Sequence, residues 1–555
     1  MRAWFKRCAS EILLRLPQRQ AIDPLFYACA FMAVGSLVLG GSTRRGGALS
    51  DVILAFLAIP ILALGTWRLF ETDITPQMRW ALWFCLALVA LPLLQLVPLP
   101  GWLWTVLPHR EISAESFALV GEGVPWMPIS VSPEATWLCA ISLLPPLALF
   151  VCAVMLSYRD RRWLSFAILA VGVIGVFLGL LQVAQGPSSI LRFFKFANRT
   201  EAVGFFANRN HFASLVYVLV ILASAWAVNA GAAAEAAFRR KEFDSFSALA
   251  AFGCLTLLVV LLAAEAMARS RAGIGLTMVA LLGAFALGAS ERRGGKEDSA
   301  MPRLLFGAIA LALILIVQFA LYRILERFEA DPLEEARLTF IPNTLQAAKA
   351  YLPLGSGIGS FLPVYPFFEH PQDLMANVFV NRPGSDVAET FLETGVLGLA
   401  LAGWFIIWFA RRSFEIWRGE VPLQADAIDW SLARSATIII ALLAAHSLVD
   451  YPLRTGAMMA VAAFACALMI EPPRSAFRPK RKVSRGGVRE RHTQRLAPTP
   501  APVLAIASPS TTPKALAAPA QPKERWGTDM QWPDEWRPSD DRDPPGGPAG
   551  PGKPK

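Results

Sequence analysis

The sequence predicts an all-α polytopic membrane protein with about twelve transmembrane helices, a large polar outer loop and a disordered C-terminal tail. Three observations lead to this fold class. Hydrophobic residues make up 55% of the 555 residues, and the mean hydropathy is +0.46. Charged residues make up 17%, against about 25% in an average soluble protein. The apolar residues gather in runs of about 20, which is the length that a membrane-spanning helix needs.

Twelve such runs lie in residues 25–471, which we take as the transmembrane domain. Basic residues in the short connections predict the orientation, because loops rich in Lys and Arg stay in the cytoplasm. Four basic connections and both termini agree with one topology, which places 98–135, 185–210 and 325–394 outside; Arg44 and Arg45 are the clearest exception. The predicted spans are 25–42, 52–70, 80–97, 136–157, 163–184, 211–230, 247–267, 272–290, 304–324, 395–411, 434–450 and 455–471.

The two ends of the chain differ from this domain. Residues 1–24 are basic and amphipathic, and we expect a cytoplasmic segment before a signal anchor rather than a cleaved signal peptide. Residues 472–555 are first basic and then rich in Pro, Ala and Thr, a composition that cannot bury a core. We expect a disordered cytoplasmic tail, whose basic part either leans on anionic lipid or only sets the orientation.

The seven cysteines do not indicate redox or metal chemistry. All but Cys8 lie in apolar runs, and no pair has the Cys-x-x-Cys spacing. We therefore interpret the thiols as small buried hydrophobic groups and expect neither disulfides nor a zinc site. We expect no metal, no other cofactor and no nucleic-acid partner.

The outer loop 325–394 is too polar to span a bilayer, yet it is too rich in Phe, Leu, Tyr and Val to be disordered. Its first part has the periodicity of an amphipathic helix, which Pro353 and Gly355 end. A second short helix is expected over 386–393, leading into the next span at Gly395. We interpret the loop as an ordered cap on the membrane surface. The residues expected on the apolar face of the first helix are Leu338, Ile341, Leu345 and Leu352.

Four polar clusters lie where predicted spans meet the outer side, and ionisable groups beside such spans mark function by default. Each has a plain structural alternative: asparagines that cap a helix, arginines that reach lipid headgroups, or an ion pair between Asp450 and Arg454. Taken together, several guanidinium groups at one membrane face suit the oxygens of a diphosphate. The clusters are 198–212 with Arg199, Asn208, Arg209, Asn210 and His211; 269–273 with Arg271; Arg337; and 446–454 with Asp450 and Arg454.

These segments resemble the signature of the O-antigen ligase and polymerase superfamily. They occur in order over residues 165–470, which is a stronger signal than one short motif. The resemblance implies a membrane fold like that of C-type glycosyltransferases. It also implies metal-independent transfer of a glycan from undecaprenyl diphosphate at the periplasmic face of the bacterial inner membrane. The segments that carry it are 204–213, 270–273, Arg337 with 353–357, 392–395 and 446–454.

The resemblance further implies roles for single residues. Arg271 and Arg337 would hold the diphosphate, with Arg199 and Arg209 as weaker candidates. Family members carry a loop histidine that activates the acceptor hydroxyl.

At the position of that histidine this chain has Gly384, which cannot take up a proton. Another group would then serve as the base. His370 is our first candidate, because a histidine suits proton transfer near neutral pH, and Asp386 is the second. The structural alternative for His370 is a surface residue in a turn.

We expect the protein to transfer or polymerise an undecaprenyl-diphosphate-linked glycan at the periplasmic face, with a glycan or lipid A-core as the acceptor and the lipid bilayer as its surroundings. The residues do not separate a ligase from a polymerase. Two alternatives stay open. The missing histidine favours a protein that binds lipid-linked glycan without catalysis. A transporter of lipid-linked sugars is the other, although a carrier is expected to hold its site near the midplane rather than at one face.

Overall fold

The computed structural model describes residues 23–43, 48–194, 197–240, 245–292, 332–373 and 380–473. The chain divides into two units, Met1–Lys480 and Arg481–Lys555, and every described residue belongs to the first. The predicted span 304–324 lies outside the described residues. So do the first 22 residues and the tail after residue 473.

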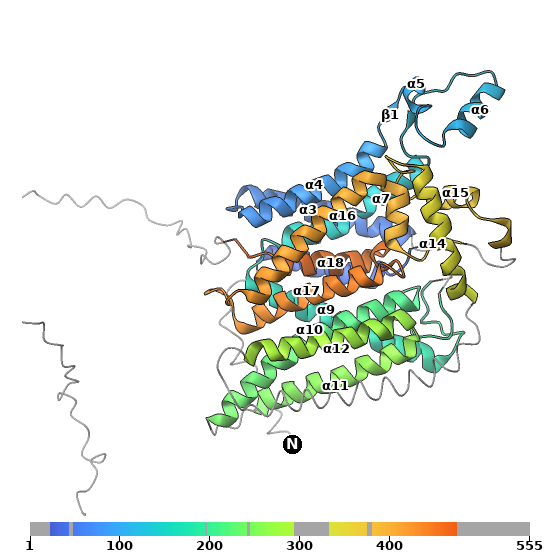
Figure 1. Cartoon of the computed structure of the whole chain (residues 1–555). Coiled ribbons are helices and arrows are strands. Elements are labelled where there is room, and N and C mark those ends of the chain that lie inside the picture. The colour runs from blue at the N-terminus through green and yellow to red at the C-terminus, as the bar shows by residue number, and fades with distance from the viewer. Residues whose placement is uncertain are drawn as a thin grey trace, which may run out of the picture. The chain divides into compact units, whose positions relative to one another are not determined.

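Long helices dominate the described part of the chain (Figure 1). Eight segments there are long and apolar enough to cross a membrane, and three shorter apolar helices accompany them. The eight are α3 (Ala48–Phe70), α4 (Pro76–Gln95), α7 with α8 (Pro133–Ser142 and Leu144–Ala153), α9 (Tyr158–Gln185), α10 (Arg209–Arg239), α12 (Arg271–Arg292), α16 (Asp386–Arg418) and α17 (Ala427–His446). The shorter ones are α2 (Pro24–Leu39), α11 (Ser245–Ala268) and α18 (Gly456–Leu468).

The all-α class is thus confirmed, and the multi-pass character with it. The total of twelve spans stays a prediction, because three predicted spans fall on the shorter helices and 304–324 is not described. Several bounds differ from those expected, and two of them matter for the site. The predicted span 434–450 ends earlier, at His446, and α16 begins nine residues before 395 because the expected short helix and the span are continuous except for a break at Gly395.

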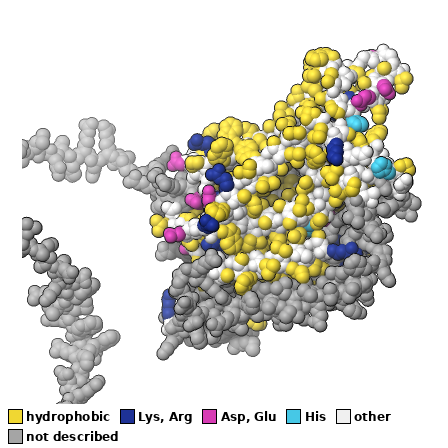
Figure 2. Space-filling model, viewed as in Figure 1, with side chains coloured by type: hydrophobic (Ala, Val, Ile, Leu, Met, Phe, Trp, Pro, Cys, Tyr) yellow, Lys and Arg dark blue, Asp and Glu magenta, His cyan; other side chains and the backbone are white. Residues whose placement is uncertain are grey.

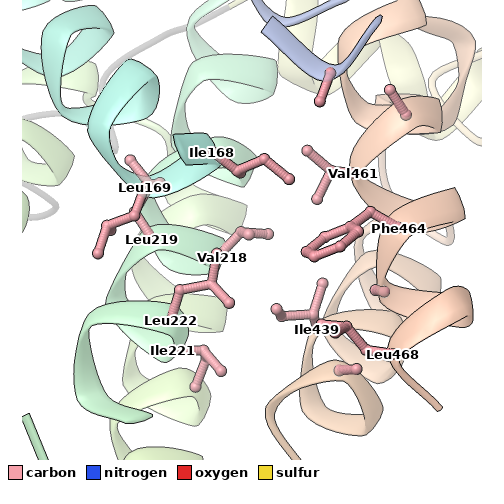
Figure 3. Packing of buried hydrophobic residues seen from close by; sticks show 14 of the residues in the cluster. Ile168, Leu169, Val218, Leu219, Ile221, Leu222, Ile439, Val461, Phe464 and Leu468 are labelled. Atoms are coloured by element: carbon pink, nitrogen blue, oxygen red, sulfur yellow. The ribbon is translucent and has the colours of Figure 1, made fainter. Parts of the chain in front are cut away.

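The hydrophobic core is centred on α10, which is buried along most of its length between α9, α11, α12, α17 and α18. Branched aliphatic side chains on one side of α10 meet those of α9 and α18 (Figure 3). Such side chains fill the space between helices at the density of an organic crystal. Those labelled in Figure 3 are Ile168 and Leu169 of α9; Val218, Leu219, Ile221 and Leu222 of α10; Ile439 of α17; and Val461, Phe464 and Leu468 of α18.

One end of the bundle, here called the basic end, is held by buried arginines. The guanidinium of Arg161 donates hydrogen bonds to the carbonyl oxygens of Ala153 and Ala467, at 2.9 and 2.8 Å, near the C-terminal ends of α8 and α18. Helix C-termini leave such carbonyls without a hydrogen-bond donor and carry partial negative charge. A guanidinium there donates the missing hydrogen bonds and balances the charge. Arg162 pairs with Asp426 and Asp429 before and within α17. Figure 2 shows charged side chains gathered at the left end of an otherwise hydrophobic face.

The other end, here called the loop end, consists of residues 98–132, 186–194, 197–208, 332–373, 380–385 and 447–455. Backbone hydrogen bonds join these loops to the bundle and to one another: Ser130 N–H donates to Gln95, and Ala202 N–H donates to Met267. The elements there are β1 (Pro98–Leu99) antiparallel to β2 (Met127–Pro128), α5 (Gly101–Trp104), α6 (Glu111–Leu119), α14 (Pro332–Ala350), α15 (Phe361–Val364), and the 3-10 turns η2 (Tyr365–Phe367), η3 (Pro371–Asp373) and η4 (Pro452–Arg454).

Helix α14 confirms the expected loop helix, but the prediction of its buried face was wrong. Leu345 is 37% exposed, whereas Phe340, Ala347 and Tyr351 are buried against the aromatic segment 361–368 and the start of α16. Thr344, which is not among the residues expected on the apolar face, is buried too, and its hydroxyl donates to the carbonyl of Phe340 at 2.7 Å. That local hydrogen bond satisfies the hydroxyl, and so a face with a threonine can pack like an apolar one.

Candidate functional site

Three acidic side chains line one face of the first two turns of α16. Asp386, Glu389 and Glu393 are spaced so that they lie above one another, and Glu389 and Glu393 are 0% and 1% exposed. All three face the guanidinium of Arg454 in η4. Its Nη1 lies 3.0 Å from Glu393 Oε2 and 3.7 Å from Glu389 Oε1, and its Nε lies 3.4 Å from Asp386 Oδ1. We call these four residues, with Arg382, the acid–arginine cluster.

Arg382 adds a second guanidinium to the cluster. It pairs with Glu389 and lies over the ring of Tyr451, 5.9 Å from the centroid. Burial alone would lower the pKa of Arg454, but the three carboxylates outweigh it and raise that pKa well above its usual value. Arg454 therefore stays charged, and the cluster holds three carboxyl groups against two guanidinium groups.

Asp386 accepts its side-chain hydrogen bonds through one carboxylate oxygen, Oδ2. The Ser447 hydroxyl donates to its Oδ2 at 2.9 Å, and the backbone N–H of Leu453 donates to the same atom at 3.3 Å. Ser385, rather than Asp386, is the N-cap of α16, because its Oγ accepts from the N–H of Ala388. The other carboxylate oxygen of Asp386, Oδ1, lies 3.4 Å from Nε of Arg454, so as a base Asp386 would take up a proton beside that guanidinium in a buried position.

Glu393 fastens the glycine-rich turn 355–359 to the bundle. Its Oε1 accepts from the N–H of Gly359 at 2.8 Å, and its backbone carbonyl accepts from Gly357 N–H and from the Gln95 amide of α4. The side-chain oxygen Oε1 of Gln95 in turn accepts from the N–H of Ile358. The turn is therefore held by α4 and α16 together, next to the break at Gly395.

A second buried polar group lies beside the cluster. The Tyr217 hydroxyl is 3.2 Å from Nδ1 of His446, whose Nε2 is 3.8 Å from Oδ2 of Asp450, and all three side chains are buried. The backbone N–H of Asp386 donates to the carbonyl of Asp450 at 3.1 Å, which joins α16 to this turn. Asp450 therefore faces His446, and the ion pairs of Arg454 go to the carboxylates of α16 instead of the suggested partner Asp450.

The segment before α10 supplies a cap and an ion pair. Asn208 Oδ1 accepts from the N–H of Asn210 at 2.8 Å, which is the capping role given as its structural alternative. Arg209 pairs with Glu201 at 2.9 Å. Burial raises the pKa of Glu201, but the Thr200 hydroxyl and Arg209 lower it by more, so that this pKa falls below its usual value.

Contacts bring some of the sequence-predicted residues together and leave others apart. The ring of His211 meets that of Tyr451 edge-on at 5.1 Å, which places it beside Arg382 and the acid–arginine cluster. Arg199 and Arg271 are exposed at the loop end, Arg271 as the first residue of α12. Arg337 lies in α14, but its side chain is outside the described residues.

His370 is exposed, and among the described residues no hydrogen bond or ion pair joins it to the cluster. It follows an anchored segment, because Phe368 packs against Tyr351 and His109 with ring centroids 6.3 and 5.5 Å apart. Gly384, the position of the missing histidine, is buried and has a φ of +80°. Side chains rarely adopt that conformation, so glycine suits the local backbone.

Sequence reasoning missed Arg382, Glu389 and the side-chain role of Glu393. The i, i+3, i+7 spacing of Asp386, Glu389 and Glu393 was a usable signal, because it predicts three carboxyl groups on one helix face. No comparable signal pointed to Arg382. Among the described residues, no group of three His, Cys, Asp or Glu side chains is placed to hold a metal ion.

Comparison with known families agrees with the motif resemblance. Residues 255–403 match the family model described as O-antigen ligase. Among curated proteins, none matches the chain significantly. The matched range runs from α11 through α12 and α14 into α16, and it contains Arg271, Arg337 and the carboxylates of the acid–arginine cluster. Since the matched segment includes apolar helices of a multi-pass bundle, the chain is a membrane protein that carries an O-antigen ligase domain.

Proposed function

We propose that the chain transfers a glycan from undecaprenyl diphosphate to an acceptor hydroxyl at the periplasmic face of the bacterial inner membrane. The match of residues 255–403 to the O-antigen ligase family carries this proposal. The acceptor oxygen forms a bond to the anomeric carbon with inversion. The bond from that carbon to the diphosphate oxygen breaks, its electron pair leaves with undecaprenyl diphosphate, and the acceptor proton passes to a base. The acceptor is a glycan or lipid A-core.

The arginines of the loop end would stabilise the leaving diphosphate. Fixed cations at the site of developing charge commonly give the largest catalytic effect. Arg271 and Arg337 come first, as both lie in the matched range. Arg209 is the weaker candidate because Glu201 already balances its charge, and Arg199 is the other.

We choose between the two candidate bases, Asp386 and His370, by comparing their exposure and their contacts. Asp386 is buried and already accepts hydrogen bonds from Ser447 and Leu453. His370 is exposed next to an anchored aromatic segment, so it can meet an acceptor without breaking internal contacts. We therefore keep His370 as the first candidate and assign Asp386 mainly to the support of η4.

Arginine substitutions test the proposed diphosphate site. Transfer by the Arg337→Ala variant should fall by about 10²–10³-fold, as when one charge-stabilising donor is removed. Arg337→Lys should lose less, because it keeps the charge but not the bidentate fork. Arg271 should show the same order. The measurement is glycan transfer by purified protein at equal abundance, with Arg269→Gln as the neighbouring control. If both alanine variants transferred glycan at the wild-type rate, Arg271 and Arg337 would not bind the diphosphate as proposed.

Replacing His370 with alanine tests the base. A positioned base is typically worth about 10²–10⁴-fold in rate, so transfer should fall in that range. Gln372→Ala, an exposed neighbour, should behave like wild type. Intact transfer by His370→Ala would exclude this residue as the base.

Membrane orientation has its own test. A single cysteine at Gln372, in a background without the native cysteines, should react with an impermeant maleimide added from the periplasm, and one at Ser510 should not. The basic connections motivate this expectation, because they keep the basic end in the cytoplasm. Gln372 is exposed, so the label has access to it. The reverse labelling pattern would contradict the proposed periplasmic site.

The second candidate function is binding of lipid-linked glycan without catalysis. The buried, positive-φ backbone at Gly384 favours it, because a histidine at this position would have to adopt a backbone conformation that side-chain-bearing residues rarely take. Deletion in the host, followed by electrophoresis of lipopolysaccharide and exopolysaccharide, separates the functions. If the protein is a ligase, the deletion strain should lack capped lipopolysaccharide; if it is a polymerase, the strain should lack long glycan chains. If the deletion alters neither and purified protein transfers nothing, the binding function replaces the enzyme.

A further inference from the structure

We propose that a groove on α4 and α16 binds one acyl chain of an anionic phospholipid, with Arg79 holding the lipid phosphate. The groove has a volume of about 600 Å³. It lies away from the loop end, on α4 and on a part of α16 that follows the acid–arginine cluster. The residues that line it and carry the argument are Arg79, Trp80, Trp83, Ala87 and Ala90 of α4 and Trp404 of α16.

The shape of the groove follows from the side chains of α4. Arg79, Trp83, Ala87 and Ala90 recur at helical spacing, so they form one stripe about 16 Å long at a rise of about 1.5 Å per residue. The two alanines leave space where larger residues would fill it. The walls are indoles, and Trp404 is fixed by edge contacts with Trp80 at 6.4 Å and with Phe84 at 5.5 Å.

The charge lies at one end of this apolar stripe. Arg79 belongs to the first turn of α4, at the basic end, and its side chain is exposed. Among the described residues no carboxylate pairs with it. A guanidinium next to an apolar groove at headgroup depth matches a phosphate joined to an acyl chain. Tryptophans near a membrane interface suit the same depth.

The surroundings favour phospholipid over the other occupants. Much of α4 is exposed, and its outer face, seen in Figure 2, is covered by hydrophobic side chains, so it borders lipid. The groove begins at the basic end, whereas the proposed diphosphate site is at the loop end. A polyprenyl donor would therefore enter from the opposite leaflet. A second copy of the chain would bring no phosphate for Arg79.

Native mass spectrometry of the delipidated full-length protein tests the site by titration with phosphatidylglycerol, phosphatidylcholine or undecaprenyl phosphate. Phosphatidylglycerol should bind about tenfold more tightly than phosphatidylcholine, the size of one charge-assisted contact. Arg79→Gln should abolish that preference, and Ala87→Trp, which fills the groove, should weaken both phospholipids. Arg411→Gln, an exposed cation of α16, and Leu93→Trp, elsewhere on α4, are the matched controls and should behave like wild type.

Three outcomes would overturn the proposal. An unchanged preference in Arg79→Gln would remove the phosphate contact. Undecaprenyl phosphate bound more tightly than phosphatidylglycerol and lost in Ala87→Trp would assign the groove to the donor chain. A dimer mass lost in Ala87→Trp would assign it to a second copy. All variants should melt at the same temperature, because both substituted positions lie on the outer face of α4. A change in lipid binding then does not come from a change in folding.

Discussion

Replacing Arg454 with alanine is expected to destabilise the protein by about 3–5 kcal/mol, the cost of breaking a buried ion pair from one side. Three carboxylates, Asp386, Glu389 and Glu393, would lose the cation that they share. Arg382 is the one other guanidinium in the cluster, and its ion pair is with Glu389. The structure at the start of α16 should therefore open, or the carboxyl groups should take up protons.

Thermal melting in detergent, together with protein abundance in the membrane, measures this effect. Arg454→Lys should lose less than alanine, because it keeps the charge. Adding Glu393→Gln to Arg454→Ala should recover part of the loss, since it removes one unpaired charge. Arg411→Ala, which removes an exposed cation of α16, is the control and should stay within about 0.5 kcal/mol of wild type. Normal melting of Arg454→Ala would show that the cluster does not stabilise the loop end.

The Gly395→Ala substitution should be comparably severe, with a loss of at least about 4 kcal/mol or failure to accumulate. Gly395 has φ +55° and ψ −141°, a backbone conformation open essentially to glycine. A Cβ there would lie 2.2 Å from the carbonyl oxygen of Pro353 and 2.7 Å from the nitrogen of Gly355. The neighbouring N–H of Val396 donates to that same carbonyl at 2.9 Å, so the two backbones cannot separate without losing the hydrogen bond.

Gly403, two turns further along α16, provides a matched control. A Cβ at this position meets no atom within 4 Å, so Gly403→Ala should be neutral or stabilise the helix by up to about 1 kcal/mol. Chemical denaturation of both variants in the same detergent compares them directly. If Gly395→Ala were as stable as Gly403→Ala, the break in α16 would not be needed for the fold.

Local patterns predicted some parts of the site well. The helix 386–393 and its entry into a span at Gly395 were predictable, because a helix cap and a glycine stop act over a few residues. The buried face of α14 was not. Leu345 is more hydrophobic than Thr344, yet Thr344 is the buried one. Which face of the helix is buried depends on where the neighbouring elements pack, and the sequence of the helix does not contain that information. The same holds for Arg454, whose partners lie more than sixty residues away in α16.

The amino-acid sequence by itself determined the class of this protein. Apolar runs of bilayer length leave a chain no other way to satisfy its backbone than helices across the membrane, and residues 255–403 match the O-antigen ligase family model. Only the tertiary structure decided which charges meet. Electrostatic interactions depend on the distance between the groups, and that distance is set by how the helices pack. Packing brings Arg161 to the carbonyls at two helix ends, Arg209 to Glu201, and Arg454 to three carboxylates.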